Sequence, residues 1–332
     1  MDLKITKKRL GNMLSYDWLK ILIVVIAAIF FWSLLFTMTA TRCTDGENFY
    51  LVVYEGVKTT NASSNAKYLD DMNSEGAFSY DVLSRSVTEI SSTGQYSASY
   101  MLSLRLSTHE GDVFLSGGGN DLRKAQEEGK AEIETVAQVQ YLVNNGILQS
   151  IDDLLVAARE YCTKSFITEN GDGTYTVNEN EIEKYFREYR IGSARNYKKT
   201  YRTEAQIAEG VKKEIERIET IYKNCLYITK AIETTKGTEN DFLWYTAKMY
   251  RETEGGEVKY KDTKAYGIDL SKVKGGSEEV ESQWYLIDEE GKITTDGLVL
   301  TVFDYTQYQP DMQYETLSFL AHTLRKFGNY GE

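Results

Sequence analysis

The segment Ile21–Thr41 reads ILIVVIAAIFFWSLLFTMTAT and contains no charged residue. As an α-helix it rises about 31 Å, the hydrocarbon thickness of a bilayer, and a helix satisfies its own backbone hydrogen bonds, as a membrane span must. Lys20 and Arg42 bracket the run. Trp18 and Trp32 are rings of the kind found near membrane interfaces. The sequence therefore predicts one transmembrane helix that contacts the lipid bilayer through Ile21–Thr41.

The flanking charges indicate how this helix crosses the membrane. Five Lys or Arg residues precede it, and only Arg42 follows it closely. Because positive charge prefers the cytoplasmic side, we expect residues 1–20 in the cytoplasm and the C-terminal domain outside the cell. A cleaved signal peptide is disfavoured because the apolar core is long and Met38 stands where a small residue is needed. A lipoprotein acylated at Cys43 is disfavoured by the preceding Arg42, so we expect an uncleaved anchor.

The charge of the chain is divided unequally between its two parts. The 332-residue chain has a formal net charge of −12. Residues 1–42 carry six Lys or Arg against two Asp, a net of +4, which leaves −16 for the remainder. Nucleic-acid phosphates demand a basic face, so this acidic domain argues against nucleic acid as a partner. The simplest interpretation of the charge is solubility.

Three cysteines do not make a disulfide framework. Cys43 lies at the predicted membrane exit, whereas Cys162 and Cys225 lie in predicted helices. Buried free thiols are the favoured interpretation of the last two, and a disulfide between them stays open. Their spacing fits no metal site.

Short apolar runs alternate with helical patterns after the membrane segment. Phe49–Tyr54 (FYLVVY) is almost continuously apolar, as in a strand buried on both faces. Phe78–Ile90 predicts a second strand, and Ser97–Thr108 predicts a helix. The run Gly111–Asn120 (GDVFLSGGGN) then predicts a turn, a buried strand and a glycine-rich loop. This alternation indicates an α/β domain with a mainly parallel sheet.

The next part of the chain is mainly helical. Thr203 and Gln206 form a capping-box pattern before a helix that we expect to reach about Thr235. We expect its apolar stripe to pack on its own domain, and coiled-coil pairing is the alternative. After Gly237 the chain returns to strands, and Tyr314–Phe327 predicts a last helix. We expect a cytoplasmic tail at residues 1–20 and a transmembrane helix at 21–41. A first α/β part follows at 44–162, then a mainly helical second lobe or insertion at 163–260. The chain returns to the α/β lobe at 261–332.

No residue pattern points to catalysis, and we expect neither an enzyme nor a cofactor. The two histidines, His109 and His322, lack the spacing of a metal pair, and there is no nucleophile elbow, phosphate-binding loop or zinc motif. The run Asn170–Gly173 followed by Glu179 partly fits a calcium loop. A hairpin turn fits better, because Thr168 stands where the first acidic ligand belongs.

Two segments resemble a known family. HEGDVFLSGG at 109–118 and VQYLVNNGILQSIDDLL at 139–155 resemble the extracellular solute-binding proteins of bacterial ABC importers, which have a periplasmic-binding-protein-like fold of type 2. Membrane-anchored clostridial versions look most similar. Ala265–Ser271, and Leu298–Phe303 with the terminal helix, resemble the return of that family to its first lobe. The residues that carry the family pattern are Gly111, Asp112, Gly146, Leu148, Ile151 and Asp152.

The resemblance implies a ligand site at the carboxyl ends of the sheet strands, in a cleft between two lobes. For the glycines, a flexible turn without a ligand is an equal interpretation. The mostly helical stretch at 163–240 departs from the family and indicates a reduced second lobe. The candidate ligand-binding residues, carried over by position, are Glu55, Gly56, Ser116, Gly117, Gly118, Asn120 and Tyr266.

The function that the resemblance implies is that of a membrane-tethered extracellular protein that supplies a small solute, such as a sugar or a peptide, to an ABC permease. The mechanism would be closure around the ligand. The alternative is a degenerate binding-protein fold that acts as a protein-interaction scaffold in a cell-envelope assembly, with the helix at 203–235 as the docking surface.

Overall fold

The structure, a computed structural model, divides into two units, Met1–Arg42 and Cys43–Glu332. The residues that it describes are 7–39, 47–60, 64–79, 82–92, 96–118, 137–193, 195–251, 258–274, 277–304 and 313–330.

The first unit contains helix α1, Lys7–Thr39. Its stretch Trp18–Leu35 is long and apolar enough to cross a membrane, and none of that stretch is buried in protein. Trp32, for example, is 73% exposed. Because an apolar helix without protein cover is compatible with lipid, α1 is consistent with single-pass anchoring. The last two residues of the predicted span, Ala40 and Thr41, lie outside the described residues.

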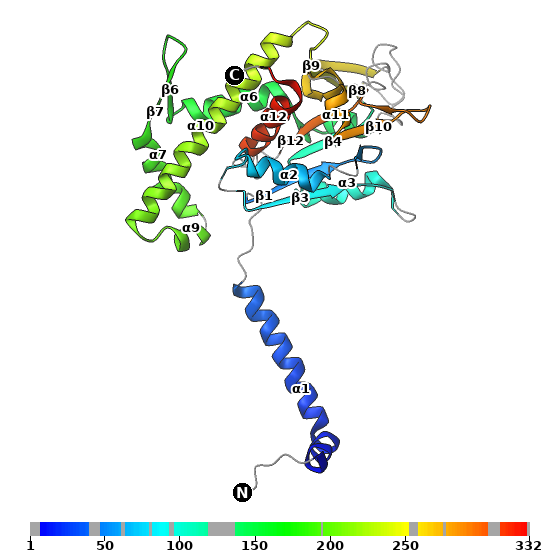
Figure 1. Ribbon diagram of the computed structural model, residues 1–332, viewed down its shortest axis with the longest axis vertical. Coiled ribbons are helices and arrows are strands. Elements are labelled where there is room, and N and C mark those ends of the chain that lie inside the picture. The colour runs from blue at the N-terminus through cyan, green and yellow to red at the C-terminus, as the bar shows by residue number, and fades with distance from the viewer. Residues whose placement is uncertain are drawn as a thin grey trace. The chain divides into compact units, whose positions relative to one another are not determined.

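The second unit is built on a seven-stranded sheet with the order β3-β1-β4-β12-β9-β8, and β5 pairs with β12 beside β9 (Figure 1). The first three strands are parallel neighbours. β12 is antiparallel to β4, β5 and β9, and β8 is antiparallel to β9. The strands are β1 Asn48–Val53, β3 Ser84–Glu89, β4 Val113–Ser116, β5 Leu148–Gln149, β8 Leu243–Arg251, β9 Val258–Asp269 and β12 Val299–Phe303.

The pairing gives β1, β3, β4, β5 and β9 one direction and β8 and β12 the other. The predicted α/β class and the largely parallel character of the sheet are therefore confirmed. The predicted strand at Phe78–Ile90 was too long, because the strand occupies only Ser84–Glu89. Phe78 instead lies in the preceding loop and buries its ring in the core.

Apolar side chains cover both faces of the sheet, which explains the continuous apolar runs of the sequence. In β4, Val113 and Leu115 belong to the core cluster under α2, α6, α10 and α12, whereas Phe114 belongs to the cluster under α3 and α5. Alternate residues of a strand point to opposite faces, so a strand covered on both sides must be apolar throughout. The long helices that contribute to the first cluster are α2 Asn65–Ser74, α6 Ile151–Thr163, α10 Glu204–Thr235 and α12 Gln313–Gly328.

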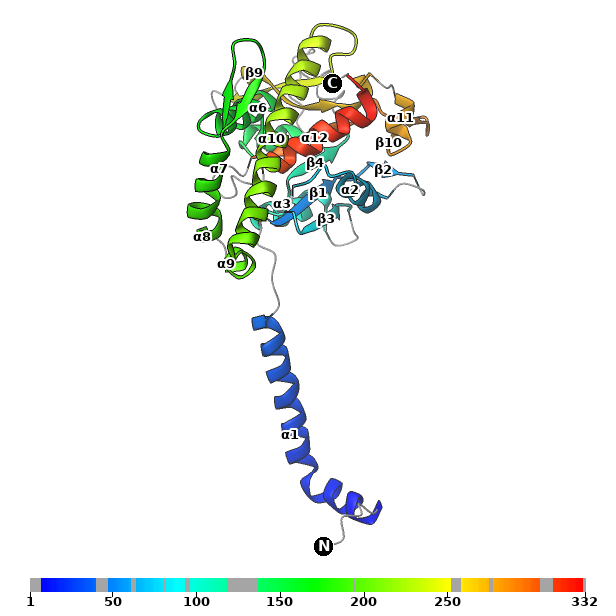
Figure 2. The same cartoon turned by 60° about the vertical axis from the view of Figure 1, so that its left-hand side comes forward.

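Helix α10 is the main element of the helical part (Figure 2). It starts at the predicted capping box, in which Thr203 accepts from the backbone N–H of Gln206 and the Gln206 side chain accepts from that of Thr203. Its buried residues pack in the same core cluster as α6 and α12. The stripe therefore packs on its own domain, as predicted.

Two cysteine side chains form hydrogen bonds between α6 and α10. The Cys162 thiol donates to the carbonyl oxygen of Ile218, and the Cys225 thiol donates to that of Leu155. Both side chains are buried and free. The structure thus agrees with the favoured interpretation of free thiols.

Smaller elements complete the unit. The predicted hairpin is confirmed, since β6 (Ile167–Glu169) pairs with β7 (Tyr175–Val177) and the Asn170 N–H donates to the Thr174 carbonyl oxygen at 2.8 Å.

The remaining elements are short helices and one small sheet. The helices are α3 Ala98–Ser107, α5 Ala137–Asn144, α7 Glu179–Tyr185, η2 Phe186–Arg190, α8 Ile191–Ser193, α9 Arg195–Thr200, η3 Leu270–Lys272 and α11 Ser277–Glu281. The sheet contains β2 Lys58–Thr59, β10 Trp284–Ile287 and β11 Ile293–Thr294.

Candidate functional site

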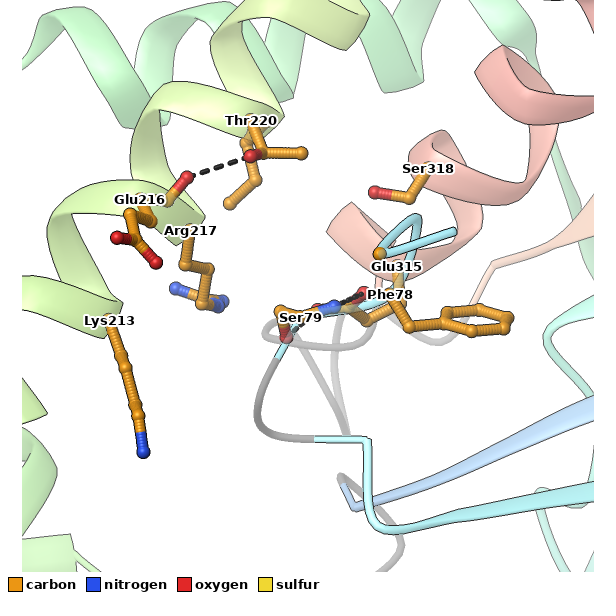
Figure 3. A pocket seen from close by; sticks show the side chains of 10 residues that line it. Phe78, Ser79, Lys213, Glu216, Arg217, Thr220, Glu315 and Ser318 are labelled. Atoms are coloured by element: carbon orange, nitrogen blue, oxygen red, sulfur yellow. Dashed lines mark hydrogen bonds between the residues drawn. The ribbon is translucent and has the colours of Figure 1, made fainter. Parts of the chain in front are cut away.

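A cavity of about 300 Å³ lies between α10, α12 and the loop that joins α2 to β3 (Figure 3). We call it the α10–α12 pocket. Helix α10 contributes Lys213, Glu216, Arg217 and Thr220 to its wall. These positions are separated by three, one and three residues, so the helical repeat places them on one face. Since the adjacent apolar stripe of α10 is packed in the core, this polar face is held in place.

A buried ion cluster fixes one of these side chains. Arg217 donates from Nη1 to Glu214 Oε1 at 3.1 Å and to the Tyr161 hydroxyl at 3.4 Å. On the other side of Glu214, Arg190 Nε lies 3.6 Å from Oε2. The side chains of Glu214 and Arg217 are 0% and 1% exposed. Two guanidinium groups on one carboxylate leave this cluster with one net positive charge at the pocket.

The facing wall is held by a second hydrogen-bonded pair. Glu315, near the start of α12, accepts from the backbone N–H of Ser79 at 3.2 Å and from the Ser79 hydroxyl. One turn further along α12, the Ser318 hydroxyl oxygen accepts a hydrogen bond from the side-chain amide of buried Asn224 on α10 at 3.1 Å. These contacts tie the loop, α12 and α10 together around the cavity, so the pocket is formed by three segments distant in sequence.

A buried carboxyl group, that of Asp112, lies behind this wall, just before β4. Asp112 is 6% exposed and accepts the backbone N–H of Tyr50 at 2.7 Å. Loss of solvation, with a smaller contribution from the negative charge of Glu315, raises the pKa of Asp112 to about 8, although the Tyr50 hydrogen bond opposes the shift. The resemblance singled out Asp112, and its position here is structural, since it joins the start of β4 to β1.

A second hollow, of about 340 Å³, lies further along α10. Lys223, Leu226, Tyr227 and Lys230 line it from α10, and Arg325 lines it from α12. The Arg325 guanidinium lies 4.5 Å from the centre of the Tyr227 ring and donates to Asn224 at 2.9 Å. The three cations of this hollow are exposed at the surface, unlike Arg217.

Five of the predicted ligand residues, Glu55, Gly56, Ser116, Gly117 and Gly118, lie away from the α10–α12 pocket, at the ends of β1 and β4 or just after them. Glu55 accepts from the backbone N–H of Ser92 at 3.1 Å and from its hydroxyl at 2.9 Å. Gly56 has a φ of +94°, the left-handed region that favours glycine, and is exposed. Because β1 and β4 are adjacent and parallel, these residues share one sheet edge with Ser116 and Gly117.

The other predicted residues have mixed positions. Ser116 is buried, and its hydroxyl has no hydrogen-bond partner among the described residues. A Cβ on Gly117 would lie 3.0 Å from the Leu286 side chain, whereas Gly118 has open space and a φ of +89°. Asn120 lies outside the described residues. Binding by this loop stays a prediction.

Tyr266 does not lie at the sheet edge formed by the carboxyl ends of β1 and β4. The strand register aligns Gly267 with Thr301 and then with Phe114, so Tyr266 lies before the level of Ser116. Its side chain is 6% exposed and packs in the core cluster of α3 and α5. Its assignment as a ligand-binding residue also stays a prediction.

The sequence analysis missed the residues of the α10–α12 pocket. One signal was present, because Glu214 and Arg217 interrupt the apolar stripe of α10 between Val211 and Ile218. A charged pair three residues apart on a buried face indicates a buried ion pair. No pattern in the sequence could pair that face with Ser79, 135 residues before Glu214, or with Glu315, 98 residues after Arg217.

Comparison with protein-family models, with curated proteins and with solved structures finds no match to this chain. The fold and the pocket are therefore the observations on which a function can be argued.

Proposed function

We propose that this chain is a membrane-tethered solute-binding protein whose domain faces the cell exterior and binds a small polar solute in the α10–α12 pocket. In this proposal α1 is the anchor, and the basic residues before it keep the N-terminus in the cytoplasm. The bound solute is passed to an ABC permease. The protein itself performs no covalent chemistry.

The main support for the proposal is a positively charged side chain, that of Arg217, which is held in one position at the pocket. Arg217 is almost fully buried and is fixed by Glu214 and Tyr161, yet it lines the cavity. A side chain held in one position loses little conformational entropy when a ligand binds, which is the usual advantage of a preformed site. The cavity volume of about 300 Å³ lies at the small end of the range of ligand pockets.

The route of the chain supports the family resemblance. After α6 the chain leaves the sheet for the helical part, and it returns first as the edge strand β8 and then as β9 and β12. β12 then pairs with β4 on one side and with β5 and β9 on the other. The resemblance implies that Leu298–Phe303 and the terminal helix return to the first lobe, and β12 indeed lies in the same sheet as β1 and β4.

The fold limits how the scaffold alternative could work. Its expected docking surface is the helix at 203–235, and Ile218, Ile221 and Ile228 of that helix are buried in the domain core. A partner would have to bind the charged face of α10 instead.

A matched pair of variants tests the proposal. Thr220 and Thr234 both lie on α10, and each donates its hydroxyl to the carbonyl oxygen four residues earlier, at 2.8 and 2.7 Å. Only Thr220 lines the pocket, while Thr234 is exposed. Thr220→Trp therefore places an indole in the cavity, whereas Thr234→Trp makes the same chemical change at the surface.

The full chain in detergent micelles is screened by thermal unfolding against sugars, amino acids, short peptides and inorganic ions. A solute at about 100 times its Kd stabilises the native state by about 2.7 kcal/mol, which corresponds to a rise in Tm of about 5 °C. We expect such a rise in the unsubstituted protein and in Thr234→Trp, but not in Thr220→Trp. An equal rise in all three proteins would place the site elsewhere, and no rise with any solute would reject solute binding.

A further inference from the structure

The charged groups that line the α10–α12 pocket balance one another. Lys213 and Arg217 are positive, whereas Glu216 and Glu315 are negative. The layer behind them is balanced too, since Arg190 lies against Glu214. A pocket of one sign would favour a simple anion or cation. A balanced pocket favours a solute that carries both charges.

The two signs are also arranged across the cavity. Figure 3 shows Arg217 reaching from α10 toward the pair of Ser79 and Glu315 on the facing wall. The α10 wall has a net charge of +1 from Lys213, Arg217 and Glu216, and the α12 wall presents the Glu315 carboxylate next to the Ser318 hydroxyl. A ligand with its carboxylate toward α10 and its ammonium toward α12 would meet a complementary charge at each end.

The lining is poorly suited to a sugar. Sugar rings stack on exposed aromatic faces. Phe78 is the aromatic residue that lines this pocket, and its ring packs 4.8 Å from the Phe49 ring and is 8% exposed. The ring is thus occupied by the core and leaves charged groups and hydroxyls to contact a ligand.

We propose that the ligand of the α10–α12 pocket is a small zwitterion, a free amino acid or a dipeptide. Its carboxylate binds Arg217 and Lys213, and its ammonium binds Glu315, with Glu216 at the pocket mouth. This inference rests on the proposed function, since it names the substrate class of the same site. A volume of about 300 Å³ accepts one or two residues and excludes a long peptide.

Calorimetric titration of the full chain in detergent micelles tests both charges of the ligand. The probes are each common amino acid, alanyl-alanine, N-acetylalanine, alaninamide and glucose. We expect binding of an amino acid or of alanyl-alanine, and at least tenfold weaker binding of the two analogues that lack one charge. Equal binding of the blocked and free forms overturns the zwitterion. Binding of glucose alone also overturns it but leaves solute binding in place, whereas no binding of any probe rejects both proposals.

Charge-neutralising variants test whether the zwitterion contacts the charged residues of the α10–α12 pocket. Lys213 and Glu216 are 44% and 63% exposed, so Lys213→Gln and Glu216→Gln are compatible with folding. We expect each to weaken binding of the zwitterionic probe by about tenfold. Lys230→Gln is the control, because it removes a cation from the same helix about 25 Å further along. A loss in Lys230→Gln equal to that in Lys213→Gln would overturn the assignment to this pocket.

Discussion

The Asp112→Asn substitution should stabilise the domain, and only in one range of pH. Asp112 has an ordinary pKa of 3.8, which burial raises to about 8 in the folded protein. The folded state therefore holds a proton that the unfolded state has lost between these two values. The free energy of unfolding therefore falls as pH rises, because the folded state binds one more proton than the unfolded state in this range. Stability contributed by the protonated carboxyl is complete below about pH 4 and is lost as pH rises toward 8.

The magnitude follows from the two pKa values. Each unit of difference is worth 1.36 kcal/mol, so about three units between 3.8 and neutral pH correspond to about 4 kcal/mol at pH 7. Asparagine is neutral at every pH and has nearly the shape of the protonated carboxyl. Its carbonyl oxygen can accept the Tyr50 N–H that Asp112 now accepts. The variant should therefore be more stable than the unsubstituted protein by about 2 to 4 kcal/mol at pH 7, and equal to it near pH 4.

Urea unfolding of the full chain in micelles, followed by tryptophan fluorescence from about pH 4 to 8, measures this difference. Trp244 and Trp284 are buried in the domain and report its unfolding. Asp153→Asn is the control. Its hydrogen bond to Lys264 lowers the pKa of Asp153, so its small contribution is present above pH 4 and is lost as pH falls. An Asp112→Asn difference that does not change with pH would refute the assignment of a protonated carboxyl at this position.

Three other substitutions or reactions give separate tests. Gly210→Ala should lower stability by about 2 kcal/mol in urea unfolding, because its Cβ would lie 2.4 Å from the Phe186 ring, whereas Gly192→Ala, with open space, should not. Glu214→Gln should cost about 3 kcal/mol by leaving two buried guanidinium groups without their carboxylate, and an unchanged urea midpoint would argue against the ion cluster. In a Cys43→Ser background, the two buried thiols should react with a thiol reagent only after unfolding, so fast reaction of the native protein would contradict their burial.

Local patterns predicted much of the fold. The capping box at Thr203 fixed the start of α10, and the continuous apolar run at Phe49–Tyr54 indicated a strand covered on both faces. These features depend on neighbours within a few residues, or on periodicity, and the sequence displays them directly. The end of the last helix was predicted for the same reason.

The pocket could not be predicted in this way. It depends on the meeting of α10 with Ser79 and Glu315, and those contacts are set by tertiary packing. The described glycines after β4, Gly117 and Gly118, lie away from this pocket, and their role in binding stays a prediction. Gly117 packs against Leu286, which gives that glycine a packing role and needs no ligand. The buried charges of α10 were the more informative signal, because a charge on an apolar stripe requires a partner that the fold must supply.

Binding to right-side-out membrane vesicles is the most direct test of a solute site on a tethered external domain. Vesicles that carry the full chain are incubated with a radiolabelled amino-acid mixture and collected by filtration. We predict retained label that rises with the amount of protein, persists in Thr234→Trp and is lost in Thr220→Trp. Label retained only after the vesicles are permeabilised, or retained equally by Thr220→Trp, would contradict the account.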